Sequence, residues 1–297
     1  MSGRGLSLET MNSQCRYKLD VDIRQGALLV AGFSKKIHQA KWLTEDSCPI
    51  VLIEMKGKNA TTEVLLNLIL EHRNIVKSFG LVEHAATTEH PESILLAQEY
   101  AKDGTLHEVL VNRTFTPTTT VLNEIFAQIS SAMIYLSEKN IVHGDLACRN
   151  VLVFESNPNV PQKNLVKLID FGLTRHSPTN SRDQVEIPVR YAAPEILLRK
   201  GQSDYSEKSD VYSFAVLIWE AYSTHATMPY ERISDDEEVS RRKLNGEKLE
   251  KPKNCNDATW ALMLQCWMDR PDDRLTFQQI HSAIQHVDKP GSALPTP

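Results

Sequence analysis

The residue types best suited to chemistry lie in the middle of the chain. Asp145 and Asn150 are five residues apart in the segment Ile141-Val-His-Gly-Asp-Leu-Ala-Cys-Arg-Asn-Val-Leu-Val153, and Asp170 follows twenty residues after Asn150. A carboxylate can accept a proton from a hydroxyl group, and carboxylate and amide oxygens are ligands that suit magnesium. These residues therefore suit proton transfer beside a bound cation. Two acidic surface turns would explain the same residues without any chemistry.

The segment resembles the catalytic loop of protein kinases, H-R-D-L-x-x-x-N, with His143, Asp145, Leu146 and Asn150 in register. Asp170-Phe-Gly resembles the D-F-G motif, and its order and distance after the loop make the pair far more specific than either motif alone. The resemblance implies that Asp145 is the catalytic base. It also implies that Asn150 and Asp170 bind magnesium, or manganese, on the phosphates of ATP.

Further motifs follow in the order of the family. Tyr191-Ala-Ala-Pro-Glu195 resembles the A-P-E element, and Asp210 stands where the family anchors the backbone of the catalytic loop. Arg274 stands where a late arginine pairs with the A-P-E glutamate, here Glu195. We expect these three residues to be structural, because breaking a buried ion pair leaves a desolvated charge.

A lysine in the first third of the chain fits the same family. Ile53-Glu-Met-Lys56 resembles V-A-I-K, which implies that Lys56 binds the α- and β-phosphates. The family places a helical glutamate about nine residues before an H-x-N-I-V stretch, here His72-Arg-Asn-Ile-Val76, and Glu63 fits that position. We therefore expect an ion pair between Lys56 and Glu63. A solvated lysine at the end of a strand is the plainer interpretation of Lys56 taken alone.

The resemblance also implies an adenine site. Gln98 is the expected gatekeeper, backbone groups of Glu99 and Ala101 are expected to meet the adenine edge, and Leu152 is expected to form the floor.

The loop that covers the phosphates departs from the family pattern G-x-G-x-x-G-x-V. Aligned on Ile37, it reads Val30-Ala-Gly-Phe-Ser-Lys-Lys-Ile37, so only Gly32 remains, and nucleotide contacts are expected at Val30, Gly32 and Ile37. Glycines let backbone N–H groups approach phosphate, so their loss predicts weaker ATP binding. Lys35 or Lys36 could compensate as a point charge, or both could be exposed surface lysines.

Two more departures concern charge. Glu54 replaces the alanine of V-A-I-K on the strand face of Lys56, where a carboxylate is unfavourable unless it is paired, protonated or turned outward by a bulge. Gly144 replaces the arginine of H-R-D, and Tyr191 is the one tyrosine between Asp170 and Glu195. We therefore predict that activity does not require phosphorylation of an activation-loop tyrosine.

Several residues point to the tyrosine-kinase branch. Ala147 and Arg149 resemble the D-L-A-A-R-N form of the catalytic loop, and Pro188-Val-Arg-Tyr-Ala-Ala-Pro-Glu195 resembles the platform beside which a substrate tyrosine extends. The resemblance implies that Arg149 belongs to the catalytic set and that the substrates are tyrosine residues of proteins, with dual or serine/threonine specificity as the alternative.

The elements that must position these residues are predicted to fall into two groups. Hydrophobic patterning predicts short strands before residue 100 and one helix, then long helices. The predicted strands are Ala27–Ala31, Ile37–Trp42, Ile50–Met55, Ile75–Val82 and Ile94–Glu99; the predicted helices are Thr61–Glu71, Val121–Lys139, Val211–Tyr222 and Thr259–Met268. Only six residues separate Lys56 from Glu63, so the first helix is expected to be short, and 155–163 is expected to be an insertion.

We therefore expect an α+β, two-lobed protein kinase fold, with a small β-rich lobe that holds one helix and a larger, mainly helical lobe. The expected boundaries are a flexible leader at 1–16, a kinase domain at 17–288 and a disordered tail at 289–297. Within the domain, the small lobe is expected at about 17–98, the linker at 99–104 and the large lobe at 105–288.

Composition narrows the function classes. The net charge of -5 gives no electrostatic reason to expect nucleic acid, and the apolar runs are too short to insert into a membrane. Five cysteines without a C-x-x-C pair indicate free thiols, and no secretory signal is evident, so a cytoplasmic location is expected. The sequence does not indicate an oligomeric state.

Two alternatives to an active tyrosine kinase stay open. A pseudokinase scaffold that regulates a partner protein is favoured by the eroded glycine loop, Glu54 and Gly144. An unrelated metabolic ATP-binding enzyme is disfavoured, because motif order and spacing match protein kinases throughout.

Overall fold

The computed structural model describes residues 16–32, 34–43, 48–57, 60–83, 93–112, 115–176, 187–201 and 205–286. The expected leader, apart from Arg16, and the expected tail lie outside the described residues, as does 177–186 of the activation segment. The chain divides into two compact units, Met1–Lys102 and Asp103–Pro297.

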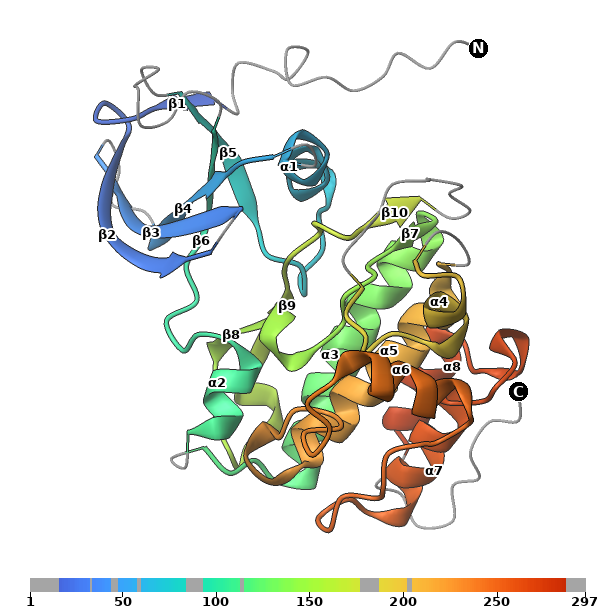
Figure 1. Cartoon of the computed structure of the whole chain (residues 1–297). Helices are drawn as coiled ribbons and strands as arrows, with labels where there is room; N and C mark the ends of the chain where they lie inside the picture. The colour runs from blue at the N-terminus through green and yellow to red at the C-terminus, as the bar shows by residue number, and fades with distance from the viewer. Residues whose placement is uncertain are drawn as a thin grey trace. The chain divides into compact units, whose positions relative to one another are not determined.

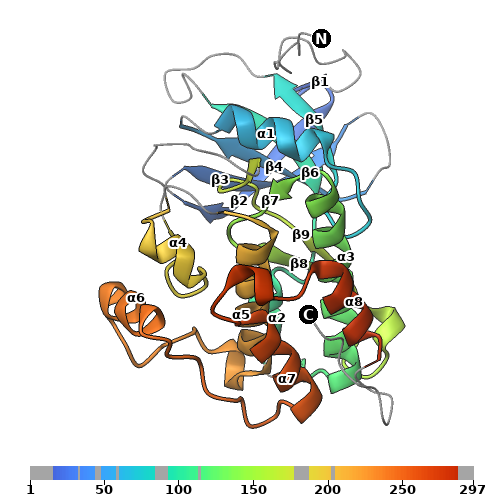
Figure 2. The same ribbon diagram turned by 90° about the vertical axis from the view of Figure 1, so that its right-hand side faces the viewer.

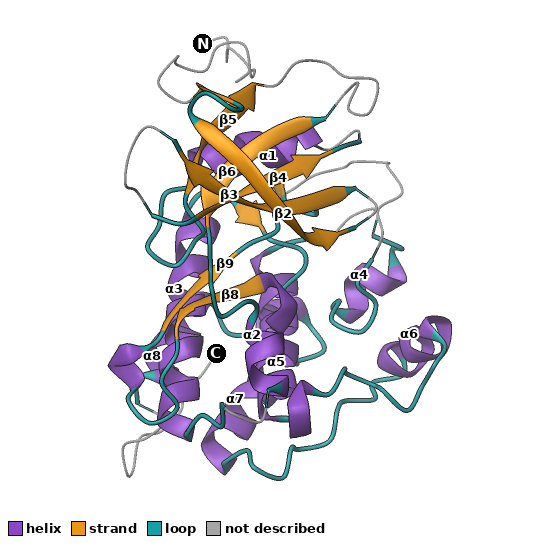
Figure 3. Ribbon diagram, turned by 90° about the vertical axis from the view of Figure 1, so that its left-hand side faces the viewer, coloured by secondary structure: helices purple, strands orange, loops and turns teal. Residues whose placement is uncertain are grey.

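A six-stranded sheet forms the first unit, with strand order β1-β5-β6-β4-β3-β2 (Figures 1 and 3). The strands are β1 (Arg16–Lys18), β2 (Ile23–Ala31), β3 (Lys35–Trp42), β4 (Ile50–Met55), β5 (Ser78–Glu83) and β6 (Ile94–Glu99). All neighbours are antiparallel except β1 and β5. The β4–β6 register places Val51 opposite Gln98, which fixes the face on which the gatekeeper position lies.

The two faces of this sheet have separate apolar cores. Ile50 and Leu52 of β4 pack with Ile23 and Ala40 on one face. Met55 packs on the other face with residues of α1 (Ala60–Ile69), the helix that covers that side in Figure 2. Because successive side chains of a strand point to opposite faces, the alternation along β4 decides which of its residues can meet α1.

Helices dominate the second unit (Figure 2). They are α2 (Leu106–Val111), α3 (Thr119–Glu138), α4 (Pro194–Leu198), α5 (Glu207–Tyr222), α6 (Asp236–Leu244), α7 (Asp257–Cys266) and α8 (Phe277–Ile284). The Thr118 hydroxyl accepts a hydrogen bond from the Val121 N–H and caps α3. Phe214 of α5 packs edge-on against Phe126 of α3 and Phe277 of α8, at ring-centroid distances of 6.4 and 5.7 Å. The nearly fully buried α5 is therefore the centre of this unit's core.

Four short strands carry the chemistry-bearing loops of the second unit. β8 (Val151–Glu155) pairs with β9 (Leu165–Leu168), and β7 (Ile141–Val142) pairs with β10 (Arg175–His176), both antiparallel. The expected insertion 155–163 connects β8 to β9, and the Asn164 amide orders it by donating to the carbonyls of Asn157, Val160 and Pro161.

The prediction of an α+β fold is confirmed: a sheet with one helix is followed by a mainly helical region. Every expected strand and helix is present: β4 and β6 have the predicted bounds, and the others have shifted ends. The predicted ranges did not include β1, β7, β8, β9, β10, α2, α4, α6 and α8. Among the residues that the structure describes, no helix is long and apolar enough to cross a membrane.

Candidate active site

The loop between β7 and β8 holds Asp145 and Asn150 against each other. The Asn150 amide nitrogen donates hydrogen bonds to the Asp145 backbone carbonyl and to its carboxylate Oδ2, both at 2.8 Å. These bonds orient the amide so that its oxygen, Oδ1, is the atom suited to a cation. The five-residue spacing thus matters because the short 3₁₀ turn Cys148–Asn150 returns the amide to the carboxylate.

Arg149 bonds to the other oxygen of the Asp145 carboxylate. Its guanidinium lies 2.5 Å from Asp145 Oδ1 and stacks over the Tyr191 ring, 4.8 Å from the ring centroid. Tyr191 is only 6% exposed, so it is a poor target for phosphorylation. Arg149 therefore connects Asp145 to the segment that resembles the substrate platform.

His143 ties the catalytic loop to the D-F-G segment. Its Nδ1 accepts a hydrogen bond from the Asp145 N–H at 3.2 Å, so Nε2 carries the proton and donates to the Ile169 carbonyl at 3.1 Å. Its ring packs against Phe171 at 5.4 Å. Burial lowers the pKa of His143, although Asp145 and Asp170 act in the opposite direction, which favours this neutral tautomer.

Asp210 anchors the loop backbone, as predicted. Its carboxylate accepts the N–H groups of His143 and Gly144 at 2.7 and 2.9 Å. Burial raises the pKa of Asp210 to about 7, against the effect of these two hydrogen bonds. A residue of α5 thus holds the backbone of the loop between β7 and β8 in place.

Gly144 has a steric reason to replace the family's arginine. Its φ is +81°, and a Cβ atom at this position would lie 3.0 Å from the Leu173 carbonyl oxygen. A side chain here would therefore strain the backbone and displace the segment after D-F-G.

Asp170 has an unusual backbone conformation, with φ at +66°. Its Oδ1 accepts the Gly172 N–H at 3.1 Å, and the preceding Ile169 donates its N–H to the Asn150 carbonyl at 3.0 Å. Asp tolerates the left-handed region better than most residues because its side chain can bond locally. The D-F-G segment is therefore held beside the catalytic loop through backbone contacts.

The donor set fits a magnesium or manganese ion on a phosphate substrate. Asn150 and Asp170 offer oxygen atoms, and a magnesium ion in such enzymes takes its other ligands from phosphates and water. No group of three or more His, Cys, Asp or Glu side chains suited to a metal occurs within the described ranges.

Glu195 and Arg274 form the expected buried pair. The guanidinium donates to both carboxylate oxygens at 2.7 and 2.8 Å, and also to the backbone carbonyls of Met268 and Lys208 at 2.9 Å each. This bidentate geometry joins the start of α4 to the loop before α8.

In the first unit, Gln98 belongs to a buried hydrogen-bond network. Its amide donates to Asn67 of α1 at 2.8 Å and to the Ser78 hydroxyl at 2.9 Å. The Glu99 N–H donates to the Lys77 carbonyl, and Ala101 is buried. Leu152 belongs to the second unit, where it lies opposite Lys167 in β8–β9 and forms a β-bridge to Thr105.

The phosphate-loop positions lie at one end of the β2–β3 pair. The Gly32 N–H donates to the Lys35 carbonyl at 2.8 Å, and a Cβ at Gly32 would lie 3.1 Å from that oxygen, so the retained glycine fits a tight turn. Val30 is 53% exposed and lies opposite Ile37 in the sheet register.

The ion pairs of this unit differ from the expected Lys56–Glu63 pair. Lys56 Nζ lies 2.9 Å from Glu54 Oε1, and Glu63 Oε1 lies 2.6 Å from Lys35 Nζ. Glu54 is thus buried and paired, which resolves one question left open by the sequence. Strand alternation explains the difference, because Lys56 follows the face of Glu54 whereas Glu63 lies on a helix that covers the opposite face.

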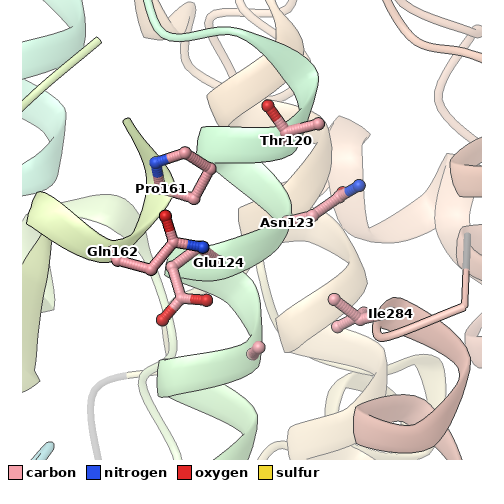
Figure 4. Close-up of a pocket in the computed structure, with 7 residues that line it drawn as sticks. Thr120, Asn123, Glu124, Pro161, Gln162 and Ile284 are labelled. Carbon is pink, nitrogen blue, oxygen red and sulfur yellow. The ribbon is translucent and has the colours of Figure 1, made fainter. Parts of the chain in front are cut away.

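Two features of the second unit were not predicted from the sequence. One is Glu220, buried in α5, which accepts the Cys148 N–H at 3.0 Å and lies 3.1 Å from His107 Nδ1. A glutamate inside an otherwise apolar helical run was its only signal. The other is a cavity of about 290 Å³ between α3, the Pro161–Lys163 turn and α8 (Figure 4). Its lining includes no predicted site residue.

Comparison with protein families agrees with this geometry. Residues 27–284 match the family described as protein tyrosine and serine/threonine kinase. The chain therefore belongs to this family, whose members are phosphotransferases that generally use ATP and magnesium.

Relatives of the chain are tyrosine kinases. It is 30% identical to the tyrosine-protein kinase abl-1 of Caenorhabditis elegans over 96% of its length and 22% of the relative's. It is 34% identical to the tyrosine-protein kinase Btk of Drosophila melanogaster, over 84% of its length and 31% of the relative's. It is also 34% identical to the proto-oncogene tyrosine-protein kinase ROS of Mus musculus, over 76% of its length and 10% of the relative's. The chain thus spans at most about a third of these curated relatives.

Proposed function

We propose that this protein is an active tyrosine kinase that transfers the γ-phosphoryl group of ATP to tyrosine hydroxyls of protein substrates. The observation that carries the proposal is the arrangement around Asp145. Its carboxylate is bonded to both Arg149 and Asn150, and Arg149 stacks on Tyr191 of the platform segment.

Each of these residues has a role in the proposed reaction. Asp145 accepts the proton of the substrate hydroxyl as the phosphoryl group is transferred. Arg149 and Asn150 hold the carboxylate in place, and Arg149 offsets its charge. Asn150 and Asp170 would hold the magnesium ion, which neutralises phosphate charge when bound. In the first unit, Gln98, Glu99 and Ala101 are proposed to receive the adenine.

Turnover on a defined substrate tests the proposal. The purified chain, incubated with ATP, magnesium and a poly(Glu,Tyr) peptide, is expected to form phosphotyrosine but little product on a matched serine peptide. Asp145→Asn is expected to lower kcat by about 10²–10⁴-fold, the usual contribution of a general base. Asp269→Asn, at an aspartate whose side chain is 81% exposed, is the matched control and should leave kcat unchanged.

A pseudokinase that regulates a partner protein is the second candidate, because Glu54 stands where the family has alanine and its side chain is only 4% exposed. A wild-type chain that neither forms phosphotyrosine nor gains thermal stability from ATP would favour this alternative. Equal turnover in wild type and Asp145→Asn would also reject Asp145 as the base.

We also propose a cytoplasmic location. The described cysteines are free thiols, namely Cys48, Cys148, Cys255 and Cys266, as expected in a reducing compartment. Oxidation of the purified chain with glutathione buffers of cytosolic and secretory potential, followed by thiol counting, tests this proposal. Formation of an intramolecular disulfide would contradict it.

A further inference from the structure

Two lysines of the first unit, Lys35 and Lys56, could bind the phosphates of ATP. In protein kinases the phosphate-binding lysine pairs with a glutamate of the helix beside the sheet. The structure gives Glu63, the helix glutamate, a lysine partner from β3 and not from the end of β4. The register of the two strands shows why.

Lys35 stands on the face of the sheet that α1 covers. In the β3–β4 pair, Lys35 lies opposite Met55 and Lys36 lies opposite Glu54. Residues directly opposite in neighbouring strands share a face, and Met55 packs against Ala60 and Val64 of α1. Lys35 therefore reaches Glu63 from its own face, with 2.6 Å between Nζ and Oε1.

β4 presents only apolar side chains to the face of the sheet that α1 covers. Val51, Ile53 and Met55 alternate with Ile50, Leu52 and Glu54, and the second set lies on the other face. Lys56 continues the second set and binds Glu54 Oε1 at 2.9 Å. Because the Glu54 side chain is only 4% exposed, a cation beside it offsets the cost of burying its charge.

The ion pair of Lys35 is partly removed from water. The Lys35 side chain is 26% exposed and that of Glu63 is 9% exposed, so the pair is screened less than one on the open surface. An ammonium carries three N–H donors, so the same group can bond a carboxylate and phosphate oxygens together.

Lys35 also lies in the loop that covers phosphates in this family. It occupies the third glycine position of the G-x-G-x-x-G pattern, and its carbonyl accepts the Gly32 N–H that closes the turn between β2 and β3. A lysine at this position adds a compact positive charge where the glycine pattern supplied backbone N–H groups.

We propose that Lys35, positioned by Glu63, is the residue that binds the ATP phosphates in this protein, and that Lys56 instead neutralises Glu54. The proposal rests on the proposed use of ATP. It accounts for two departures from the family pattern together. Lys56 lies on the face of β4 opposite α1, beside Glu54, and Lys35 of the glycine loop supplies a lysine on the α1 face instead.

Nucleotide binding and turnover of three lysine variants test the assignment. Lys35→Met is compared with Lys56→Met and with Lys41→Met, the matched control at an exposed lysine near the other end of the same strand and outside the glycine loop. Binding of a fluorescent N-methylanthraniloyl-ATP is measured, followed by its displacement with ATP, ADP and adenosine. The poly(Glu,Tyr) assay then gives kcat/KM for ATP.

Lys35→Met is expected to weaken ATP and ADP binding by about 10- to 100-fold, the effect of losing a charge-assisted hydrogen bond. Adenosine binding should change less than about twofold, because adenosine has no phosphate for the lysine to bind. The kcat/KM for ATP should fall by about 100-fold or more. Lys41→Met should stay within about twofold of wild type in every measurement. Lys56→Met should lose less turnover than Lys35→Met and should lower Tm, because it leaves Glu54 without the cation 2.9 Å away.

A folding control separates positioning from stability. Lys35→Met leaves the Glu63 carboxylate without this cation, so the double variant Lys35→Met/Glu63→Gln removes that charge as well. We expect the double variant to regain the Tm that Lys35→Met loses while ATP binding stays weak. If ATP binding returned together with Tm, Lys35 would be a structural residue and the proposal would be wrong.

The remaining outcomes distinguish the two proposals. Intact ATP affinity in Lys35→Met together with lost affinity in Lys56→Met would overturn the Lys35 assignment and leave the kinase proposal standing. A wild-type chain that binds ATP through Lys35 but transfers no phosphate would support Lys35 and overturn catalysis. A wild-type chain that binds no ATP would overturn both proposals.

Discussion

The buried pair Glu195–Arg274 offers the sharpest quantitative test of how the second unit is stabilised. The Arg274 side chain is completely buried and donates to two carboxylate oxygens and two backbone carbonyls. Arg274→Met keeps an unbranched chain of similar reach but leaves Glu195, 15% exposed, without its counter-charge. The variant therefore measures the cost of removing the counter-charge of a mostly buried carboxylate together with the donors to the Met268 and Lys208 carbonyls.

The expected loss is about 3–5 kcal/mol in the free energy of unfolding, the range for removing one partner of a buried pair. For a unit the size of Asp103–Pro297, each kcal/mol shifts Tm by about 2–4 °C, so Tm should fall by roughly 6–20 °C. Urea unfolding followed by tryptophan fluorescence measures the free energy, and Trp267, buried in the same unit, reports on it. Differential scanning calorimetry measures Tm.

Two further variants make the result interpretable. Arg274→Met/Glu195→Leu replaces the whole pair by apolar residues and should recover most of the loss, because no charge is left buried. Arg241→Met removes a pair between Arg241, 66% exposed, and Glu238, and should lower the free energy of unfolding far less than Arg274→Met does, because water screens the pair. The reasoning would be refuted if Arg274→Met cost as little as Arg241→Met, or if the double variant were no more stable than Arg274→Met.

Three other changes have expected outcomes. Gly144→Ala should destabilise by more than Gly246→Ala in urea unfolding, because both glycines have positive φ but only Gly144 would bring a Cβ within 3.0 Å of a carbonyl oxygen; equal losses would contradict this. Burial lowers the pKa of Lys243 to about 7 from 10.5, so the unfolded chain binds more protons here between these pH values, and the stability advantage of wild type over Lys243→Met should grow from pH 7 to pH 9. An advantage that stays constant over this range would mean that the three carbonyls bonded to its Nζ keep the ammonium charged. Gln98→Leu should cost about 1–3 kcal/mol by removing the donor to Asn67, and Gln98→Leu/Asn67→Leu should recover part of it, which urea unfolding measures.

Local sequence patterns predicted most of the second unit's site. The contacts among Asp145, Arg149 and Asn150 arise within one turn of the chain, so their spacing almost determines them. The Asp210 and Arg274 contacts span the sequence but follow a fixed motif order. The helices that were not predicted, α4 and α6 among them, are short, and short helices owe most of their stability to tertiary packing.

The first unit could not be predicted as well, because strand register decides which face each charge takes. A shift of one residue moves a side chain to the opposite face of a sheet. The resemblance to V-A-I-K assigned phosphate binding to Lys56 and predicted its pair with Glu63, whereas the β3–β4 register puts Lys35 opposite Met55 and its Nζ lies 2.6 Å from Glu63 Oε1. No local pattern around Lys35 distinguishes it from an exposed lysine.

The two ion pairs of the first unit are coupled through the cost of buried charge. If Lys56 turned to Glu63, the nearly buried Glu54 side chain would lose the cation that lies 2.9 Å from its Oε1, and removing a counter-charge from a buried carboxylate is destabilising. Lys35 removes the need for that exchange, because it already lies on the helix face of the sheet. Glu54 and Glu63 thus each have a lysine within ion-pair distance, Lys56 at 2.9 Å and Lys35 at 2.6 Å, and the two lysines lie on opposite faces of the sheet. This division of the two carboxylates between two lysines is the physical basis for assigning phosphate binding to Lys35.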